Sequence, residues 1–205
     1  NMVAIEVAAA PGARIIARAA GLPDTLFEHD GQITKREIRA MTLSALAPRR
    51  GETLWDIGAG AGSVAIEWML ADVSLRAVAI EADAERAARI ARNAAAFGVP
   101  GLRVVQGRAP EIFSAAIARE QPDAIFIGGG AGDAGVLDGA IAALRGGGRL
   151  VVNAVTLETE ALLIARHAAL GGTLTRIAIE RAEPIGRMTT WRPALPVTQW
   201  VWVKS

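Results

Sequence analysis

The sequence has no cysteine and no tyrosine, and only two of its 205 residues are histidine. Without cysteine, disulfides and thiolate metal sites are excluded. The two histidines, His29 and His167, are far apart in the sequence, which argues against a histidine-rich metal site. We therefore expect no metal.

The sequence also lacks an excess of either charge, because 22 basic and 21 acidic residues leave a net charge of +1. A strong nucleic-acid binder usually carries a basic excess or tail, so we expect no nucleic-acid partner. No run of about 18 apolar residues is free of charge, and we expect no membrane span. The start lacks a basic region followed by an apolar block, so we expect no secretory signal and a cytoplasmic protein.

Short apolar runs alternate with segments of helical periodicity along most of the chain. The runs predicted as strands are 53–57, 76–81, 102–106, 123–128, 149–155, 173–181 and 196–204. The segments predicted as helices are 34–46, 63–71, 83–98, 110–120, 133–145 and 157–170. Such alternation predicts an α/β fold with a mostly parallel seven-stranded sheet, helices on both faces and an antiparallel last strand.

Local signals set the expected boundaries. Thr34 with Glu37 three residues later predicts a capping box that starts the first helix, and Asp83 predicts the cap of the third. The proline- and arginine-rich stretch 182–195 is expected to be a loop. Residues 1–33 resemble a linker-like N-terminal segment, and residues 34–205 are expected to form one domain.

A glycine-rich turn follows the first predicted strand, in "LWDIGAGAGSVAIEW" (54–68). Gly58, Gly60 and Gly62 have the spacing G-x-G-x-G, whereas a dinucleotide-binding turn has G-x-G-x-x-G. Asp56 before the turn would repel a pyrophosphate but tolerates an ammonium or a sulfonium, and S-adenosylmethionine carries both. Glu81 ends the second strand, where its carboxylate can accept hydrogen bonds from both hydroxyls of an adenosine ribose.

With these motifs the chain resembles the Rossmann-like class I S-adenosylmethionine-dependent methyltransferases over residues 34–204. The resemblance implies S-adenosyl-L-methionine as the cofactor. It also implies that the third strand ends beside the adenine and the fourth beside the methyl group. From the residues and the resemblance together we expect these residues to bind the cofactor: Thr34, Asp56, Gly58, Ala59, Gly60, Ala61, Gly62, Glu81 and Ala109.

The turn after the fourth strand, "GGGAGD" (128–133), lacks the proline and aromatic residues of enzymes that methylate base nitrogens. Without tyrosine as well, a base stacked between rings is not expected. Three blocks, residues 21–46, 107–111 and 147–159, resemble the decarboxylating precorrin methyltransferases of cobalamin biosynthesis. The likeness is to the C-terminal, C15-methylating part of the two-domain members.

That resemblance implies methylation of a precorrin at C15 coupled to decarboxylation of the C12 acetate side chain. It also implies an upstream methyltransferase domain in the full-length protein and a homo-oligomer. The substrate carries several carboxylates, so basic and polar side chains should line its cleft. We expect substrate contacts from Lys35, Arg36, Asn153, Thr156, Arg187 and Arg192. No catalytic residue is assigned.

Three alternatives stay open from the residues alone. The chain could be a class I methyltransferase acting on RNA or protein, or a non-catalytic module that binds the cofactor. An NAD-dependent dehydrogenase is a more distant alternative, disfavoured by the glycine spacing.

Overall fold

The computed structural model describes residues 2–13, 15–113 and 121–205. Its main sheet has the seven strands β1 (Thr53–Ile57), β2 (Arg76–Glu81), β3 (Arg103–Gln106), β4 (Ala124–Ile127), β5 (Arg149–Ala154), β6 (Thr173–Ile177) and β9 (Val197–Val203). A separate ribbon pairs β7 (Glu180–Ile185) with β8 (Met188–Pro193). The helices are the short 3-10 helix η1 (Asp24–Leu26), α1 (Arg36–Leu46), α2 (Ser63–Ala71), α3 (Ala84–Ala96), α5 (Val136–Ala143) and α6 (Leu157–Leu170).

The strand order is β3-β2-β1-β4-β5-β9-β6. The first five pair in parallel, and β9 runs antiparallel to both β5 and β6. The predicted seven-stranded sheet with an antiparallel last strand is therefore confirmed. The chain turns from β2 and β3 on one side of β1 to β4 and β5 on the other, so the order reverses between β1 and β4. Ligands bind at such a switch point in open α/β sheets.

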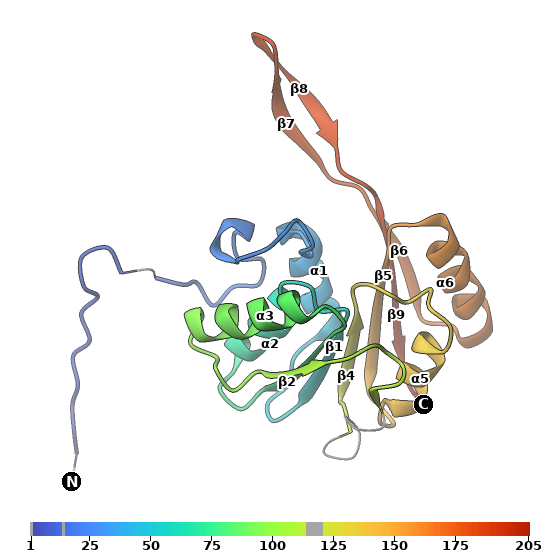
Figure 1. The fold of residues 1–205 in the computed structure, drawn as a ribbon, viewed down its shortest axis with the longest axis horizontal. Coiled ribbons are helices and arrows are strands. Elements are labelled where there is room, and N and C mark those ends of the chain that lie inside the picture. The colour runs from blue at the N-terminus through green and yellow to red at the C-terminus, as the bar shows by residue number, and fades with distance from the viewer. Residues whose placement is uncertain (1, 14, 114–120) are drawn as a thin grey trace.

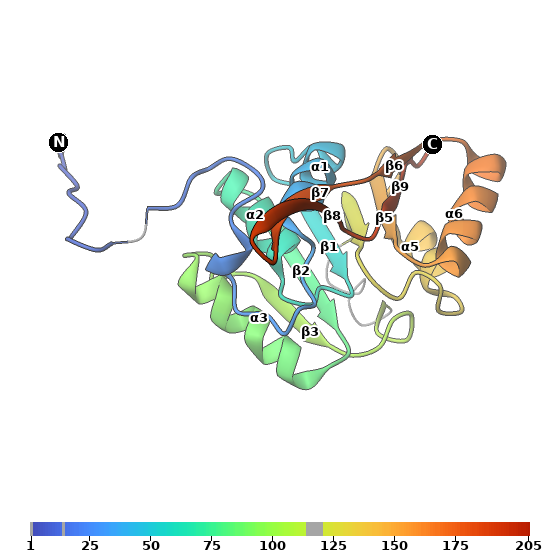
Figure 2. The ribbon, with the colours of Figure 1, turned by 90° about the horizontal axis from the view of Figure 1, so that it is seen from above.

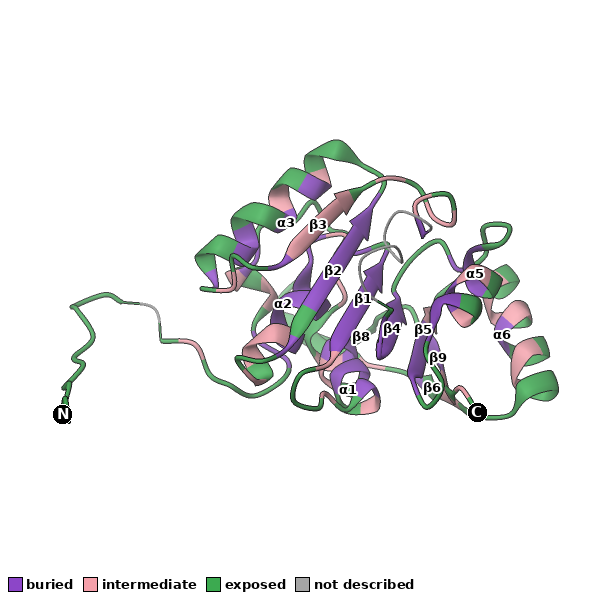
Figure 3. Ribbon diagram, turned by 90° about the horizontal axis from the view of Figure 1, so that it is seen from below, coloured by how far each residue is buried: buried purple, intermediate pink, exposed green. Residues whose placement is uncertain are grey.

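Helices cover both faces of the sheet, as Figures 1 and 2 show. The helices α1, α2 and α3 pack on one face around Leu46, Trp68 and Ile90. On the other face, α5 and α6 pack around Leu137 and Leu163. Burial is concentrated in the central strands, and every residue of β1 and β4 is buried (Figure 3). Their continuous apolar runs follow from this position, because a parallel strand covered on both faces has no solvent side.

The stretch expected to be a loop is instead an antiparallel ribbon, which projects from the body in Figure 1. The prediction was wrong because Pro184 and Pro193 argue against a central strand. Each strand of a two-stranded ribbon has an unpaired edge, where a missing N–H is tolerated. Gly186, at φ +60°, begins the two-residue turn between Ile185 and Met188.

The first helix also begins later than expected. α1 starts at Arg36, its N-cap is Lys35, and no side chain caps it, so the predicted capping box at Thr34 is wrong. The Thr34 carbonyl accepts a hydrogen bond from the buried Arg39 guanidinium. The cap at Asp83 is confirmed, because its carboxylate accepts from the Arg86 backbone N–H at 2.9 Å. The helix expected over 110–120 falls largely on residues 114–120, outside the described residues.

The segment before α1 packs against the domain: Ile16 is partly buried against the core, and Leu22 and Phe27 are buried. The Glu67 carboxylate on α2 accepts from the backbone N–H groups of Gly21 and Leu22, at 2.6 and 2.9 Å, and from Arg39 Nε at 2.6 Å. Residues 2–13 are exposed. Over the described ranges, no helix combines the length and apolar character needed to cross a membrane.

Candidate functional site

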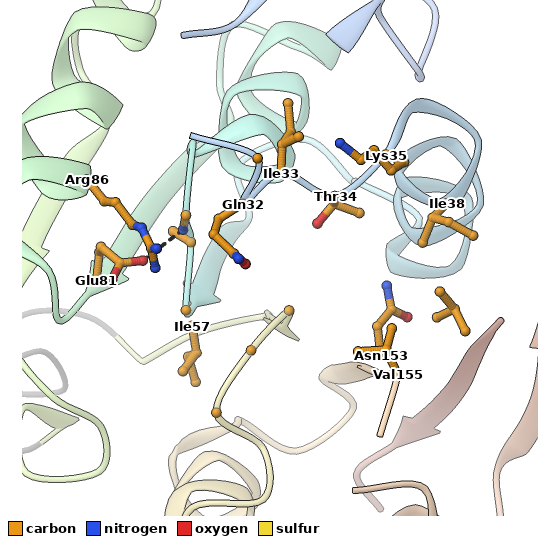
Figure 4. Close-up of a pocket in the computed structure, with 18 of the residues that line it drawn as sticks. Gln32, Ile33, Thr34, Lys35, Ile38, Ile57, Glu81, Arg86, Asn153 and Val155 are labelled. Atoms are coloured by element: carbon orange, nitrogen blue, oxygen red, sulfur yellow. Dashed lines mark hydrogen bonds between the residues drawn. The ribbon is translucent and has the colours of Figure 1, made fainter. Parts of the chain in front are cut away.

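A cavity of about 660 Å³ opens above the carboxyl ends of β1, β2 and β4, at the switch point of the sheet. One half is lined by the glycine turn and by the residues that follow β2, β3 and β4. The other half is lined by residues of α1, β5 and β7 and by Ala194, Leu195 and Val197. We call the first the turn half and the second the ribbon half. The segment 31–35 lines the cavity between these halves (Figure 4).

The first two glycines of the turn let other backbone segments approach closely. Gly58 and Gly60 have φ of +68° and +58°, a region that favours glycine. A Cβ at Gly58 would lie 2.6 Å from the Gly129 carbonyl oxygen, and one at Gly60 would lie 2.9 Å from that of Gln32. The residues Gly58, Ala59 and Gly60 line the cavity as expected for cofactor binding.

The third glycine has a different role. Gly62 is the N-cap of α2 at φ +74°, and a Cβ there would lie 2.7 Å from Ile90 on α3. Ala61 is 1% exposed and belongs to the core. Neither Ala61 nor Gly62 is among the described residues that line the cavity. These two predicted cofactor residues thus hold α2 and α3 together beneath the turn.

Asp56 lies under the glycine turn rather than at the cavity surface. It is 1% exposed, its Oδ2 accepts from the Ala65 N–H at 3.1 Å, and its Oδ1 has no hydrogen-bond partner. Burial raises the pKa of Asp56 to about 7, and the nearby charge of Glu81 adds to this. The side chain thus ties the end of β1 to the first turn of α2.

Glu81 stands at the end of β2 and lines the cavity. Its Oε2 accepts from the Gly60 N–H at 2.9 Å, and its Oε1 accepts from the Asp83 N–H at 3.0 Å. Arg86 on α3 lies beside it (Figure 4), and its Nε donates to Asp30 at 2.9 Å. Two fixed N–H groups therefore orient the carboxylate, whose remaining lone pairs can accept hydroxyl hydrogen bonds.

The residues after β3 and β4 complete the turn half. Gly107, Arg108 and Ala109 line it on one side and Gly128–Gly130 on the other. Arg108 and Asp133 approach each other to 3.7 Å across the opening. Ala109, which was expected to contact the adenine, thus lines the cavity.

The ribbon half has an apolar wall and a few polar groups. The apolar side chains are Ile38, Val155, Ile179, Leu195 and Val197. Asn153 presents its amide here, held from behind by Thr42 and Gln199. Its Nδ2 donates to Thr42 Oγ1 at 3.1 Å, and its Oδ1 accepts from Gln199 Nε2 at 2.9 Å.

Of the six predicted substrate residues, Lys35 and Asn153 line the cavity. The other four lie outside its described lining. Arg36 Nε donates to the Gly21 carbonyl at 2.8 Å, and Thr156 caps α6. Arg187 is exposed in the ribbon turn, and Arg192 pairs with Glu183 on the ribbon at 3.2 Å.

The sequence reasoning missed several lining residues, namely Gln32, Glu37, Arg86 and Arg181. Arg86 had a usable signal, since it lies in the first turn of the helix that follows β2. Arg181 had none, because the ribbon was expected to be a loop. Thr34 lines the cavity as expected. Across the described residues, no group of three or more potential metal ligands occurs.

The arrangement suits a ligand that bridges the two halves. The turn half offers backbone N–H groups and a fixed carboxylate, which match a nucleoside with free ribose hydroxyls. The ribbon half offers apolar surface with cations at its edge, which matches a flat acidic molecule. A cavity joining both can hold a donor and an acceptor in contact, the main requirement for group transfer.

Comparison with known proteins gives a consistent result. A family model described as a precorrin methyltransferase domain matches residues 25–204. A Sinorhizobium protein named precorrin-6Y C(5,15)-methyltransferase [decarboxylating] is 65% identical over the whole chain, which spans about half, 49%, of that relative's length. A Saccharolobus solfataricus protein, named as a probable cobalt-precorrin-6B C(15)-methyltransferase (decarboxylating), is 39% identical over 68% of the chain and 71% of its own length.

Among solved structures, one is described as the C-terminal domain of precorrin-6Y C5,15-methyltransferase from Rhodobacter capsulatus. It superposes with a TM-score of 0.84 at 49% identity, covering 92% of this chain and all of that one.

Proposed function

Because the chain belongs to the precorrin methyltransferase family, we propose that it methylates a precorrin at C15 and decarboxylates the C12 acetate. The methyl donor is S-adenosyl-L-methionine. The observation that carries the proposal is that Glu81 and the glycine turn share one cavity with an apolar wall edged by cations. The family match favours a tetrapyrrole acceptor over RNA or protein.

The residues of the turn half fit the cofactor. Gly58 and Gly60 leave space that a Cβ would fill, and the Glu81 carboxylate is oriented toward the cavity by two backbone N–H groups. We propose that Thr34, Ala59 and the Ala109 backbone complete this contact surface. When bound, the cofactor supplies a methyl group on a sulfonium, an electrophile that needs no further activation.

The protein's own part in the chemistry is positioning. The apolar wall of Ile38, Val155 and Val197 holds the flat ring so that its nucleophilic carbon faces the turn half. Held by Glu81 and the glycine turn, the cofactor would supply the methyl group for the new carbon–carbon bond. Loss of CO2 from the acetate leaves an electron pair that the conjugated ring accepts, and a proton then completes the methyl group.

Isotope-labelled turnover tests the proposal. A precorrin substrate and S-adenosylmethionine with a deuterated methyl group are incubated with the protein, and the tetrapyrrole is analysed by mass spectrometry. The expected product has gained one labelled methyl group and lost one CO2. A product that has neither change, with a protein shown by calorimetry to bind the cofactor, refutes the tetrapyrrole assignment.

We further propose that this chain is joined to an upstream methyltransferase domain and assembles as a homo-oligomer. The first proposal is supported by the coverage of about half of the Sinorhizobium relative. Light scattering of the full-length protein tests the second, and a monomer would contradict it.

A further inference from the structure

An ion pair lies in the ribbon half of the cavity, between segments distant in the sequence. Arg181, near the base of β7, donates from Nη2 to Oε2 of Glu37 on α1. Both residues line the cavity, and their side chains are 43% and 40% exposed. Partly solvated pairs of this kind contribute little stability, so the arginine can exchange one carboxylate for another at small cost.

Two further donors line the cavity, Asn153 in the ribbon half and Lys35 at its border with the turn half. Lys35 has no ion-pair partner among the described residues, and it lines the cavity from the start of α1. Asn153 is fixed from behind by Thr42 and Gln199, and its Nδ2 uses one N–H for Thr42. An amide nitrogen carries two N–H groups, so one is left for a ligand. In Figure 4 the amide of Asn153 points toward α1.

We propose that Arg181, Lys35 and Asn153 form a binding subsite for a carboxylate of the substrate. In this proposal Glu37 holds Arg181 until that carboxylate displaces it. The inference rests on the proposed function, since it needs an acceptor with acidic side chains. The arginine fork can bind a carboxylate through two parallel hydrogen bonds, while the lysine adds charge and the amide adds direction.

The charges of Arg181, Lys35 and Glu37 predict the direction in which each substitution changes the affinity for the substrate. Two cations and one carboxylate leave a single positive charge, so Glu37 competes with the incoming group. Removing Arg181 should weaken binding, whereas neutralising Glu37 should strengthen it. A residue that served only to fasten the ribbon to α1 would give the same effect from either side of the pair.

The test measures binding of uroporphyrin I, a tetrapyrrole bearing a carboxylate on every side chain, by fluorescence titration. Arg181→Ala should weaken binding about ten-fold, which corresponds to about 1.4 kcal/mol. Arg181→Lys, which keeps the charge but not the fork, should fall between. Glu37→Gln should tighten binding, and calorimetry should show S-adenosylmethionine affinity unchanged in all three.

Arg176→Ala is the matched control. Arg176 is also a strand arginine paired with a helix glutamate, Glu160 at 3.0 Å, but lies outside the described cavity lining. Equal losses in Arg176→Ala and Arg181→Ala overturn the subsite, and so does weaker binding in Glu37→Gln. Circular dichroism verifies folding, and Arg181→Lys serves if Arg181→Ala is unfolded.

The proposed function and the carboxylate subsite are refuted by different results. A wild-type protein that binds S-adenosylmethionine but neither binds uroporphyrin nor converts a precorrin refutes the proposed function, and the subsite falls with it. Normal wild-type binding with no loss in Arg181→Ala refutes the subsite alone.

Discussion

Replacing Glu81 with glutamine tests a carboxylate that two backbone N–H groups fix in the cavity. The carboxylate accepts from the Gly60 N–H at 2.9 Å and from the Asp83 N–H at 3.0 Å. Glutamine keeps the size and one accepting oxygen, but its amide nitrogen must face one of these donors. The substitution therefore removes charge and one hydrogen bond without opening a cavity.

The magnitudes follow from these contacts. A hydrogen bond to a charged group contributes about 1.5–3 kcal/mol, so the free energy of unfolding should fall by about 2 kcal/mol. Cofactor affinity should fall about 30-fold, which is about 2 kcal/mol, if the carboxylate binds the ribose hydroxyls. Because the charge of Glu81 helps raise the pKa of Asp56 to about 7, that pKa should also decrease.

Isothermal titration calorimetry with S-adenosylmethionine measures the affinity, and carbon-detected NMR follows the Asp56 carboxyl. Glu183→Gln is the control, because Glu183 is a carboxylate on the ribbon that pairs with Arg192 and lies outside the described cavity lining. Wild-type affinity in Glu81→Gln would refute the ribose role. An unchanged pKa of Asp56 would refute the electrostatic coupling.

Three further substitutions test the support of the site. The folded pKa of Asp56 is raised, so its stabilising contribution is present below about pH 4 and lost as the pH rises through about 7. The stability of Asp56→Asn relative to wild type should therefore increase over that window in urea unfolding, and a flat difference would contradict the shift. Gly58→Ala should cost more than the ~1–2 kcal/mol expected of Gly98→Ala, which shares the positive φ but has open space around it; equal unfolding midpoints would refute the close approach. Glu67→Gln should cost about 3–5 kcal/mol, because it leaves Arg39 buried without its closest carboxylate, and limited proteolysis should then cut the segment before α1; resistance equal to wild type would contradict this anchor.

The glycine turn, the mostly parallel sheet and the cap at Asp83 could be predicted because each is indicated by the pattern of residues along the chain. Gly58 and Gly60 have positive φ, a backbone conformation that favours glycine, so a glycine-rich turn can be recognised from the sequence. Continuous apolar runs indicate strands that are covered on both faces. The buried position of Asp56 could not be predicted from neighbouring residues alone. Its distance from the cavity depends on how α2 packs against β1, and the motif alone does not give this.

The predictions that failed did so because contacts outside the local pattern set the structure. At the start of α1 the N-cap is Lys35 instead of Thr34, and the Thr34 carbonyl accepts from the Arg39 guanidinium, which also donates to the Leu22 carbonyl and pairs with Glu67. In the ribbon, two prolines led to the prediction of a loop, whereas the pairing of β7 with β8 becomes evident only when the two strands are aligned. Local propensity is a weak prior where a buried charge fixes the backbone.

The two halves of the cavity differ in how the groups that bind a ligand are held in place, and this has a consequence for specificity. In the turn half, the backbone at the glycines sets the shape, and backbone N–H groups of neighbouring residues fix the Glu81 carboxylate. In the ribbon half, side chains meet across long stretches of sequence, with Glu37 and Arg181 separated by 144 residues and Thr42 and Asn153 by 111. Because the ribbon contacts the turn half through none of the described hydrogen bonds, changes in its side chains can alter acceptor choice while cofactor affinity stays constant. The separate titrations of uroporphyrin and S-adenosylmethionine measure that independence directly.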